Sequence, residues 1–359
     1  MQALLTAGGH GTRLRPITYT LNKHLIPLAN KPMIFYALEK IAEANIKDVF
    51  INVNPGDKEI FQAVGNGKRW GLNVKYIEQT GGPKGLAHIL KIAQPYLGDE
   101  SFIFYLGDNL IFSSINKFVE KFEREKYHSL LTLSKVKDPQ RFGVPEISKD
   151  GKILRVEEKP KNPKSNFAVT GIYIYSPEVF RALEHIKPSF RGELEISDVH
   201  TWLINNGYNI GYEEITGWWK DTGRPEDLLE GNDLLLRYSC PNGKIEGKVE
   251  RGVILDGKVT IGKGSKVFGK TIIKGPAIIG KNCQIKNSFI GPNTSIGDNA
   301  RISESEIERS IILANSFIKS AGKKITNSLI GEGARIIPNF ESLPSGHRLI
   351  IGKDSQIEL

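Results

Sequence analysis

The chain has 359 residues, of which 39% are hydrophobic and 25% are charged, and its formal net charge is +9. This composition is typical of a folded globular protein and excludes an intrinsically disordered chain, while the length favours two domains. The two cysteines, Cys240 and Cys283, occur without a CxxC pair or a histidine at zinc spacing, which excludes a disulfide framework and argues against a zinc site.

The N-terminus lacks the basic and apolar regions of a signal peptide, and no apolar stretch approaches the ~18 residues of a membrane span. We therefore expect a cytoplasmic protein with no membrane partner. Lysine and arginine are scattered rather than gathered in runs with aromatic residues, so we expect no nucleic-acid partner either. Small anionic substrates account for the positive charge equally well.

In chain order, short apolar runs alternate with helical patterns over the first two thirds of the sequence. We predict strands at residues 3–7, 48–54, 74–78, 102–106, 129–136, 153–157, 168–175 and 212–215, and helices at residues 32–44, 115–126 and 193–205. Such alternation predicts an α/β domain with a mainly parallel sheet. Pro145 interrupts the apolar run at residues 142–147, which predicts an edge strand or a bulge there.

The residue pattern of the sequence changes after about residue 236. Isoleucine or valine recurs mostly every six residues, and glycine often follows directly. The repeating positions are Ile261, Val267, Ile273, Ile279, Ile285, Ile290, Ile296, Ile302, Ile307 and Ile312. A hexapeptide period predicts a left-handed β-helix, whereas a β-sandwich would repeat every 8 to 12 residues. We therefore expect domains at residues 1–236 and 237–359, the second ending in a C-terminal tail.

A glycine-rich loop, GGHGTRLRP, directly follows the first predicted strand. Glycines at the end of a strand allow backbone amides to approach phosphate groups that a Cβ would keep away. The loop matches neither the dinucleotide fingerprint nor a Walker A loop, because the required glycines are missing. Arg13 and Lys23 follow the glycines, and such cations can neutralise a triphosphate.

The loop and its continuation, GGHGTRLRPITYTLNKHLIPLANKPM, resemble the signature of the sugar-phosphate nucleotidyltransferase family. Further motifs in the same order are GDN, RFGV, EEKP, NFAVTGIYIY, RGELEISDV and WKDTG. Together they resemble the glucose-1-phosphate thymidylyltransferases over about residues 1–235, and the hexapeptide region resembles the long form of that family. The resemblance implies a Rossmann-like mixed-sheet nucleotidyltransferase domain, followed by the left-handed β-helix.

The resemblance also implies roles for individual residues. Arg13, Lys23, Lys159 and Asp108 are the catalytic candidates, and the substrate-binding candidates are Gly8, Gly9, Gly11, Thr12, Gln79, Gly85, Gly143, Glu158, Lys159, Val169 and Trp219. Gln79 would bind the pyrimidine edge and Glu158 the sugar hydroxyls. Trp219 would wall the sugar pocket, although a tryptophan beside Trp218 suits the core equally well.

Two aspartates follow predicted strands, Asp108 after the run FIFYL and Asp221 in WKDTG. Carboxylates at strand ends can project into one crevice, and two of them together with phosphate oxygens suit Mg²⁺. A single aspartate after a strand is more often a helix cap. The resemblance favours the metal interpretation for Asp108 and Asp221, with Mg²⁺ as cofactor.

The expected reaction joins dTTP and glucose 1-phosphate to give dTDP-glucose and pyrophosphate. The sugar phosphate is already an oxyanion at neutral pH, so catalysis should rest on positioning and charge neutralisation rather than on a general base. Homo-oligomers are common in the family, and the β-helix could supply an interface.

Three alternatives stay open. UTP could replace dTTP, with glucose 1-phosphate or N-acetylglucosamine 1-phosphate as acceptor. The N-terminal domain could be a non-catalytic sensor of nucleotide sugars. The β-helix could itself be an acyltransferase, although no histidine occurs between Ile245 and Ile336 and His347 lies in the tail.

Overall fold

The computed structural model describes residues 1–82, 84–238, 243–338, 349–350 and 352–358. Its contacts divide the chain into two compact units, Met1–His10 with Met33–Asp221, and Gly11–Pro32 with Thr222–Leu359. This division differs from the single break expected near residue 236, because an early segment packs with the C-terminal region. Among the described residues, no helix has the length and apolar character needed to cross a bilayer.

The first unit contains a nine-stranded mixed sheet in the order β10-β9-β11-β6-β1-β4-β5, which β8 and β12 join beside β11. The strands are β1 (Gln2–Thr6), β4 (Asp48–Val53), β5 (Asn73–Glu78), β6 (Phe102–Leu106), β8 (Ser129–Lys135), β9 (Gly143–Ile147), β10 (Ile153–Glu158), β11 (Phe167–Tyr175) and β12 (Ile210–Glu214). Strands β1, β4, β5 and β6 are parallel, whereas β11 runs antiparallel to β6 and β8. The predicted strands are confirmed, with ends shifted by a residue or two.

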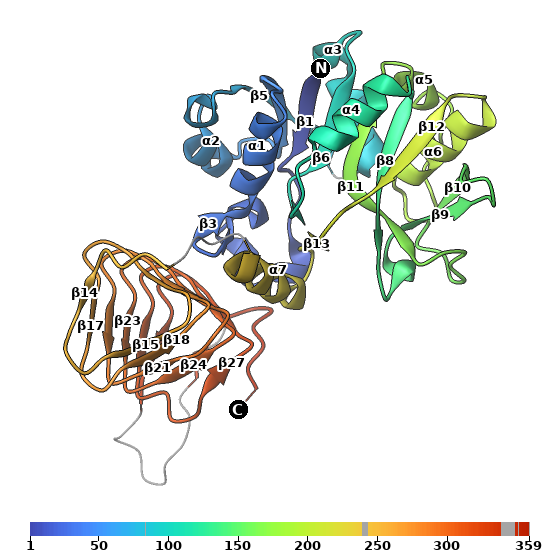
Figure 1. The fold of residues 1–359 in the computed structure, drawn as a ribbon. Helices are drawn as coiled ribbons and strands as arrows, with labels where there is room; N and C mark the ends of the chain where they lie inside the picture. The colour runs from blue at the N-terminus through green and yellow to red at the C-terminus, as the bar shows by residue number, and fades with distance from the viewer. Residues whose placement is uncertain (83, 239–242, 339–348, 351, 359) are drawn as a thin grey trace. The chain divides into compact units, whose positions relative to one another are not determined.

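Helices lie beside this sheet (Figure 1). They are α1 (Met33–Glu43), α2 (Lys58–Val64), α3 (Leu86–Leu97), α4 (Asn116–Arg124), α5 (Val179–Ala182) and α6 (Ile196–Asn205). In α3, Ala87, Leu90, Ala93 and Leu97 recur at helical spacing, and all four are buried in the core. Helix α6 begins three residues after the predicted start because residues 193–195 take part in an ion-pair network described below.

Pro145 lies in β9, which has a neighbouring strand on each side and is therefore not an edge strand. The pairing between β9 and β11 is limited to Gly143 and Val169, so the ladder on that side does not reach Pro145. On the other side the register of β10 shifts between Ile153 and Arg155. This irregularity lies on β10 opposite Glu146 and Ile147, whereas Pro145 pairs in register with Val156, so the bulge predicted at the proline is not found there.

The second unit contains a three-sided β-helix of short parallel strands, as the hexapeptide period predicts (Figure 1). One sheet holds β14 (Lys248–Val249), β17 (Lys266–Phe268), β20 (Gln284–Lys286), β23 (Arg301–Ser303), β26 (Phe317–Lys319) and β29 (Arg335–Ile336). A second holds β15 (Ile254–Asp256), β18 (Ile272–Lys274), β21 (Phe289–Ile290), β24 (Glu306–Glu308) and β27 (Ile325–Thr326). The third holds β16 (Val259–Ile261), β19 (Ala277–Ile279), β22 (Thr294–Ile296), β25 (Ile311–Ile312) and β28 (Leu329–Ile330).

The repeating aliphatic residues of the sequence fill the interior of this β-helix. Each of the ten positions named above is at most 1% exposed, and together they form one continuous core. Burial of each such side chain contributes about 1.5–3 kcal/mol. Stacking one rung on the next therefore stabilises the domain without any long helix.

Residues 11–32 and helix α7 (Pro225–Tyr238) pack with the β-helix in the second unit. The early segment forms the short turns η1 (Thr12–Leu14), η2 (Ile17–Tyr19) and η3 (Lys23–Leu25), and the hairpin β2 (Pro27–Leu28) and β3 (Lys31–Pro32). The Ala29 N–H donates to Asn232 Oδ1 at 2.8 Å, and Asn30 Nδ2 donates to the Ile296 carbonyl at 2.7 Å. Ser295 Oγ also donates to Asn232 Oδ1, at 3.0 Å. These bonds tie the segment to α7 and β22.

Candidate active site

Gly8 and Gly9 follow the carboxyl end of β1, where the parallel strands of the sheet end together. The Gly9 N–H donates to Asn54 Oδ1 at 3.0 Å, and Gly9 has a φ of 104°, which favours glycine. A Cβ on Gly8 would lie 3.3 Å from Gln79 Oε1. The structure thus brings Gln79, predicted to bind the base, directly beside the two glycines predicted to bind the nucleotide.

The rest of the glycine-rich loop lies in the second unit. Gly11 has a φ of 53°, and a Cβ there would lie 3.2 Å from Lys23 Cβ. Thr18 Oγ1 donates to the Gly11 carbonyl at 2.8 Å, which closes the turn. Thr12 and Arg13 are exposed on η1, and Lys23 is half-buried. The predicted Lys23 is therefore packed beside the loop that also carries Arg13.

Asp108 lies between β6 and the short strand β7 (Asn109–Ile111), and Asp221 ends β13 (Trp219–Asp221). Strands β7 and β13 pair antiparallel, with Asp221 opposite Asn109. The backbone therefore places the two predicted metal ligands on neighbouring positions of one small hairpin-like pair, although they are far apart in sequence.

Asn109 is 3% exposed and joins several parts of the site through its side-chain amide. Its Nδ2 donates to Asp108 Oδ1 at 2.9 Å. Its Oδ1 accepts two bonds, from Trp219 Nε1 at 2.7 Å and from the Gly171 N–H at 3.1 Å. Two donors on one side and a carboxylate on the other determine which way the amide faces.

Trp219 connects the β7–β13 strand pair to the predicted sugar site. Its ring makes an edge contact with the ring of Phe142, with centroids 5.4 Å apart. Phe142 precedes Gly143, whose Cα is paired with that of Val169 on β11. Trp219 is half-buried, and its role as a wall of the sugar pocket stays a prediction.

Glu158 and Lys159 would point to opposite faces if both continued a strand. The structure resolves this difficulty, because β10 ends at Glu158 and Lys159 adopts a left-handed φ of 45°. The turn brings Lys159 Nζ to 3.4 Å from Glu158 Oε1. A non-glycine residue in this region costs of order 1–3 kcal/mol, and such residues cluster at functional sites.

Further groups hold the Glu158 carboxylate. Ser197 Oγ donates to Glu158 Oε2 at 2.8 Å, and Arg191 Nη2 lies 3.9 Å from Glu158 Oε1. Arg191 is itself held by Glu195, with Nη2 to Oε2 at 2.8 Å. Burial, followed by the charges of Glu195 and Glu158, raises the pKa of Asp198 above its usual range. The site thus combines a fixed carboxylate with two cations.

Gly85 links the base region to the segment that carries Arg191. It has a φ of 93°, and a Cβ there would lie 2.4 Å from the Leu194 carbonyl oxygen. The Leu194 N–H in turn donates to the Lys84 carbonyl at 2.8 Å. Only glycine fits this close backbone approach. The packing is therefore sufficient to explain a glycine at position 85, whether or not Gly85 also contacts a nucleotide.

The donor groups fit a magnesium ion better than a transition metal. Within the described ranges, no group of three or more histidine, cysteine, aspartate or glutamate side chains gathers as a metal cluster. Asp108 and Asp221 offer carboxylate oxygens alone, and Mg²⁺ is usually held by one or two carboxylates together with water and substrate phosphate. These two residues are therefore the candidates to hold such an ion.

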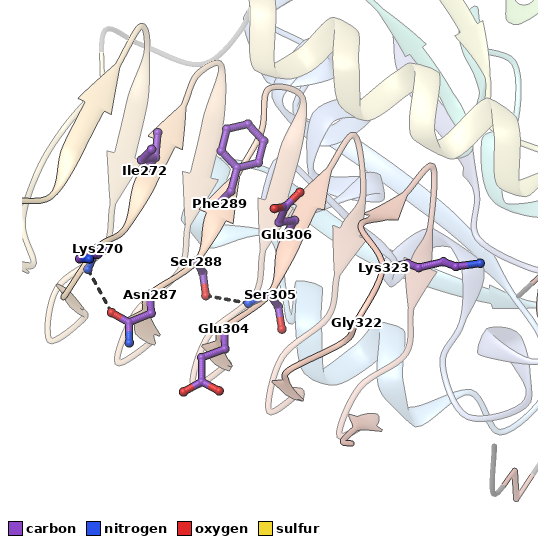
Figure 2. Close-up of a pocket in the computed structure, with 10 residues that line it drawn as sticks. All are labelled: Lys270, Ile272, Asn287, Ser288, Phe289, Glu304, Ser305, Glu306, Gly322 and Lys323. Atoms are coloured by element: carbon purple, nitrogen blue, oxygen red, sulfur yellow. Dashed lines mark hydrogen bonds between the residues drawn. The ribbon is translucent and has the colours of Figure 1, made fainter. Parts of the chain in front are cut away.

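A separate hollow of about 370 Å³ lies on the outside of the β-helix (Figure 2). Its lining includes Lys270, Phe289, Glu306 and Lys323, with a backbone bond from the Lys270 N–H to Asn287 Oδ1 at 3.0 Å. None of the described lining residues is a histidine or a cysteine. His347, the candidate for acyl transfer, lies outside the described residues.

Asn109, Arg191 and Ser197 are the residues of this site that the sequence did not single out. All three lie inside motifs already noted, GDN and RGELEISDV. A polar residue next to a predicted ligand is a usable signal, but its partners come from β11 and β13 and become visible only in the fold.

The sequence and the fold of the chain are similar to those of known proteins. The family described as Nucleotidyl transferase matches residues 2–237. Glucose-1-phosphate thymidylyltransferases of Streptomyces antibioticus and Streptomyces griseus are 45% and 42% identical, each over 100% of this chain and 99% of the relative. A solved UDP-glucose pyrophosphorylase in complex with UDP-glucose is 25% identical, with a TM-score of 0.60 over 66% of this chain and 98% of the other.

Proposed function

The chain belongs to the nucleotidyl transferase family, and we propose that it converts dTTP and glucose 1-phosphate to dTDP-glucose and pyrophosphate. The observation that carries the proposal is the chain of contacts from Asp108 through Asn109, Trp219 and Phe142 to the Glu158–Lys159 turn, where the Lys159 N–H donates to the Phe142 carbonyl at 2.9 Å. It connects two carboxylates suited to a metal with a carboxylate and cations suited to a sugar phosphate. The choice of dTTP and glucose 1-phosphate as substrates rests on the two Streptomyces relatives, which are named glucose-1-phosphate thymidylyltransferases.

The proposed mechanism rests on binding and charge rather than on proton transfer. Glu158, held by Ser197, would accept hydrogen bonds from sugar hydroxyls, while Lys159 and Arg191 would hold the sugar phosphate. The phosphate oxygen would then attack the α-phosphorus of the nucleotide in line and expel pyrophosphate. No side chain has to act as nucleophile or general base, since the attacking oxygen is already ionised.

The nucleotide would lie along the glycine-rich loop. Gly8 and Gly9 would let a phosphate group approach the backbone beside Gln79, which would bind the pyrimidine edge, and Gly85 would add a backbone contact. Arg13 would stabilise the charge that develops at the α-phosphorus, and Lys23 the leaving pyrophosphate. Gly11 and Thr12 continue the loop between these groups.

Asp108 and Asp221 would hold Mg²⁺, which neutralises phosphate charge when it is bound. Gly143 and Val169 would present backbone groups to the sugar, and Trp219 would close one side of its pocket. We also propose a cytoplasmic homo-oligomer, and the number of subunits is measurable by light scattering of the full chain.

Pyrophosphate release on mixing the protein with Mg²⁺, dTTP and glucose 1-phosphate tests the proposal. We expect turnover with this pair to exceed that with UTP or with N-acetylglucosamine 1-phosphate. Faster turnover with UTP would favour the uridylyl alternative, which the UDP-glucose pyrophosphorylase likeness supports. Absence of turnover with every pair, in protein that binds nucleotide, would favour the sensor alternative.

A further inference from the structure

One side of the β-helix carries a regular array of positive charge. The sheet formed by β14, β17, β20, β23, β26 and β29 points one residue of each strand inward and its neighbours outward. We call its outward side chains the basic face. Its cations, all exposed, are Lys248, Lys266, Lys286, Arg301, Lys319 and Arg335. Each inward residue of this sheet has one outward residue before it and one after it. Among these outward residues Glu250, next to the first strand, is the sole carboxylate.

The charge is specific to this side of the β-helix. Outward residues of the sheet with β15, β18, β24 and β27 include Asp256, Glu306 and Glu308, against two cations, Lys274 and Lys324. The outward middle residues of the third sheet, such as Thr260 and Ser295, are uncharged. The positive charge is therefore concentrated on the basic face and is not spread evenly over the three sheets.

One pair of like charges in register costs the fold some stability. Lys248 pairs with Lys266 on the next strand, and the rungs are about 4.8 Å apart. Directly opposed like charges on neighbouring strands are destabilising. None of the six cations forms an ion pair within the part of the chain that the structure describes. Two of the cations pack on aromatic rings instead, and side chains that break such a local rule are typical of functional surfaces.

Apolar side chains lie among these cations. Phe317 lies under Arg335, whose guanidinium is 4.8 Å from the ring centroid, and Phe268 lies 5.9 Å from Lys286 Nζ. Ile337 follows on the same side and is 55% exposed. Cations mixed with phenylalanine and isoleucine are characteristic of surfaces that lie at a membrane interface, where charge and apolar contact act together.

The shape of the face also selects its partner. The six strands pair in parallel without register shifts, so the cations form a flat, rigid array. A nucleic-acid duplex is convex and would meet a flat array along one line, whereas a bilayer surface meets all six cations at once. An exposed isoleucine also finds no apolar contact on the phosphate backbone of a nucleic acid.

We propose that the basic face docks the protein peripherally onto anionic phospholipid membranes. This contact is distinct from a spanning segment, and it goes beyond the expectation from sequence that no membrane takes part. Each basic residue near an anionic surface raises affinity by about fivefold, so the array is sufficient for reversible binding. Docking would keep a soluble sugar nucleotide close to any reaction that takes place at the membrane.

Sedimentation of the full chain with vesicles tests the proposal. We expect binding to phosphatidylcholine vesicles that contain about one-third phosphatidylserine, and at least tenfold weaker binding to pure phosphatidylcholine. The double variant Lys266→Glu with Arg301→Glu should lose at least tenfold in affinity. The matched variant Lys258→Glu with Lys274→Glu changes net charge equally, outside the basic face, and should bind within about threefold of the unmodified chain.

A third variant separates a membrane from other polyanions. Ile337→Ser should weaken vesicle binding and leave the retention of the protein on heparin unchanged. Absence of vesicle binding by the unmodified chain, equal loss in both double variants, or tighter binding to RNA than to vesicles would each overturn the proposal. Pyrophosphate release, measured without vesicles, should be unchanged in all three variants, so a failure of the proposed reaction is distinguishable from a failure of docking.

Discussion

Asn109→Leu is the most informative single substitution in the candidate site. Leucine has nearly the shape of asparagine and keeps the space beside Gly171 filled, but it removes the bond from Nδ2 to Asp108 Oδ1 at 2.9 Å. Asn109 is therefore expected to be a positioning residue, which fixes one rotamer of the carboxylate proposed to hold the metal. The substitution tests that role without adding charge.

The size of the effect follows from the bond that is lost. A hydrogen bond to a charged group contributes about 1.5–3 kcal/mol, which corresponds to a roughly 10- to 150-fold fall in kcat/KM. We expect the fall to appear mainly in kcat, because Asn109 Nδ2 bonds to Asp108 rather than to the Glu158–Lys159 turn. The KM for glucose 1-phosphate should change by less than about threefold.

Two measurements distinguish positioning from a general loss of structure. Mn²⁺ binding, followed by electron paramagnetic resonance without substrates, should weaken in Asn109→Leu by about tenfold or more. Urea unfolding should also show a loss of about 1–3 kcal/mol, since the N–H groups of Trp219 and Gly171 lose their acceptor. Activity is then compared at equal folded protein.

Asn73 provides a matched control on the surface. Its Nδ2 donates to Asp48 Oδ1 at 3.2 Å, the same pair of groups in an exposed setting. Asn73→Leu should change stability by less than about 0.5 kcal/mol and leave kcat and Mn²⁺ binding unaltered. Normal kcat and normal Mn²⁺ affinity in Asn109→Leu, or an equal loss in both variants, would refute the reasoning.

Gly143→Ala should raise the KM for the sugar phosphate about tenfold or more, because the new Cβ would lie 2.9 Å from Ser197 Oγ and 3.4 Å from Glu158 Oε2; an unchanged KM in steady-state kinetics would contradict this. Lys159→Met should weaken glucose 1-phosphate binding by roughly 10- to 100-fold in calorimetry with little effect on dTTP, and equal loss for both ligands would remove the assigned role. Burial lowers the pKa of His200 to about 3, so between pH 6.5 and 3 the unfolded chain binds a proton that the folded chain does not, and stability falls by about 1.4 kcal/mol per pH unit on acidification. Urea unfolding of His200→Gln should show a smaller difference between pH 7.5 and 5.5, by about 1.4 kcal/mol, and an unaltered difference would exclude this origin.

The parts of the fold that follow a simple period were predictable from sequence. Ile261 and Ile279 lie one turn apart in the β-helix, and their burial requires only that aliphatic residues stack inward. Parallel strands such as β1 and β6 were equally clear, because a short apolar run bounded by turn residues has few other interpretations.

The geometry of the site was less predictable, since it depends on backbone conformation and on partners distant in sequence. The left-handed φ of Lys159 reverses the direction expected for a residue that continues a strand, and nothing in EEKP specifies it. Arg191 lies in a noted motif, but its approach to Glu158 depends on the turn before α6. The orientation of the Asn109 amide is fixed by hydrogen bonds from Trp219 and Gly171, which lie on two other strands.

The bond between Asn30 and Ile296 has a consequence for how the protein is made. Its two partners are 266 residues apart, and a ribosome adds about 5–20 residues per second, so roughly 15 to 50 s pass between their syntheses. During that time residues 11–32 exist without β22, and for most of it without α7. The segment that carries Arg13 and Lys23 can therefore reach its final packing only near the end of translation, however early the first strands of the sheet assemble.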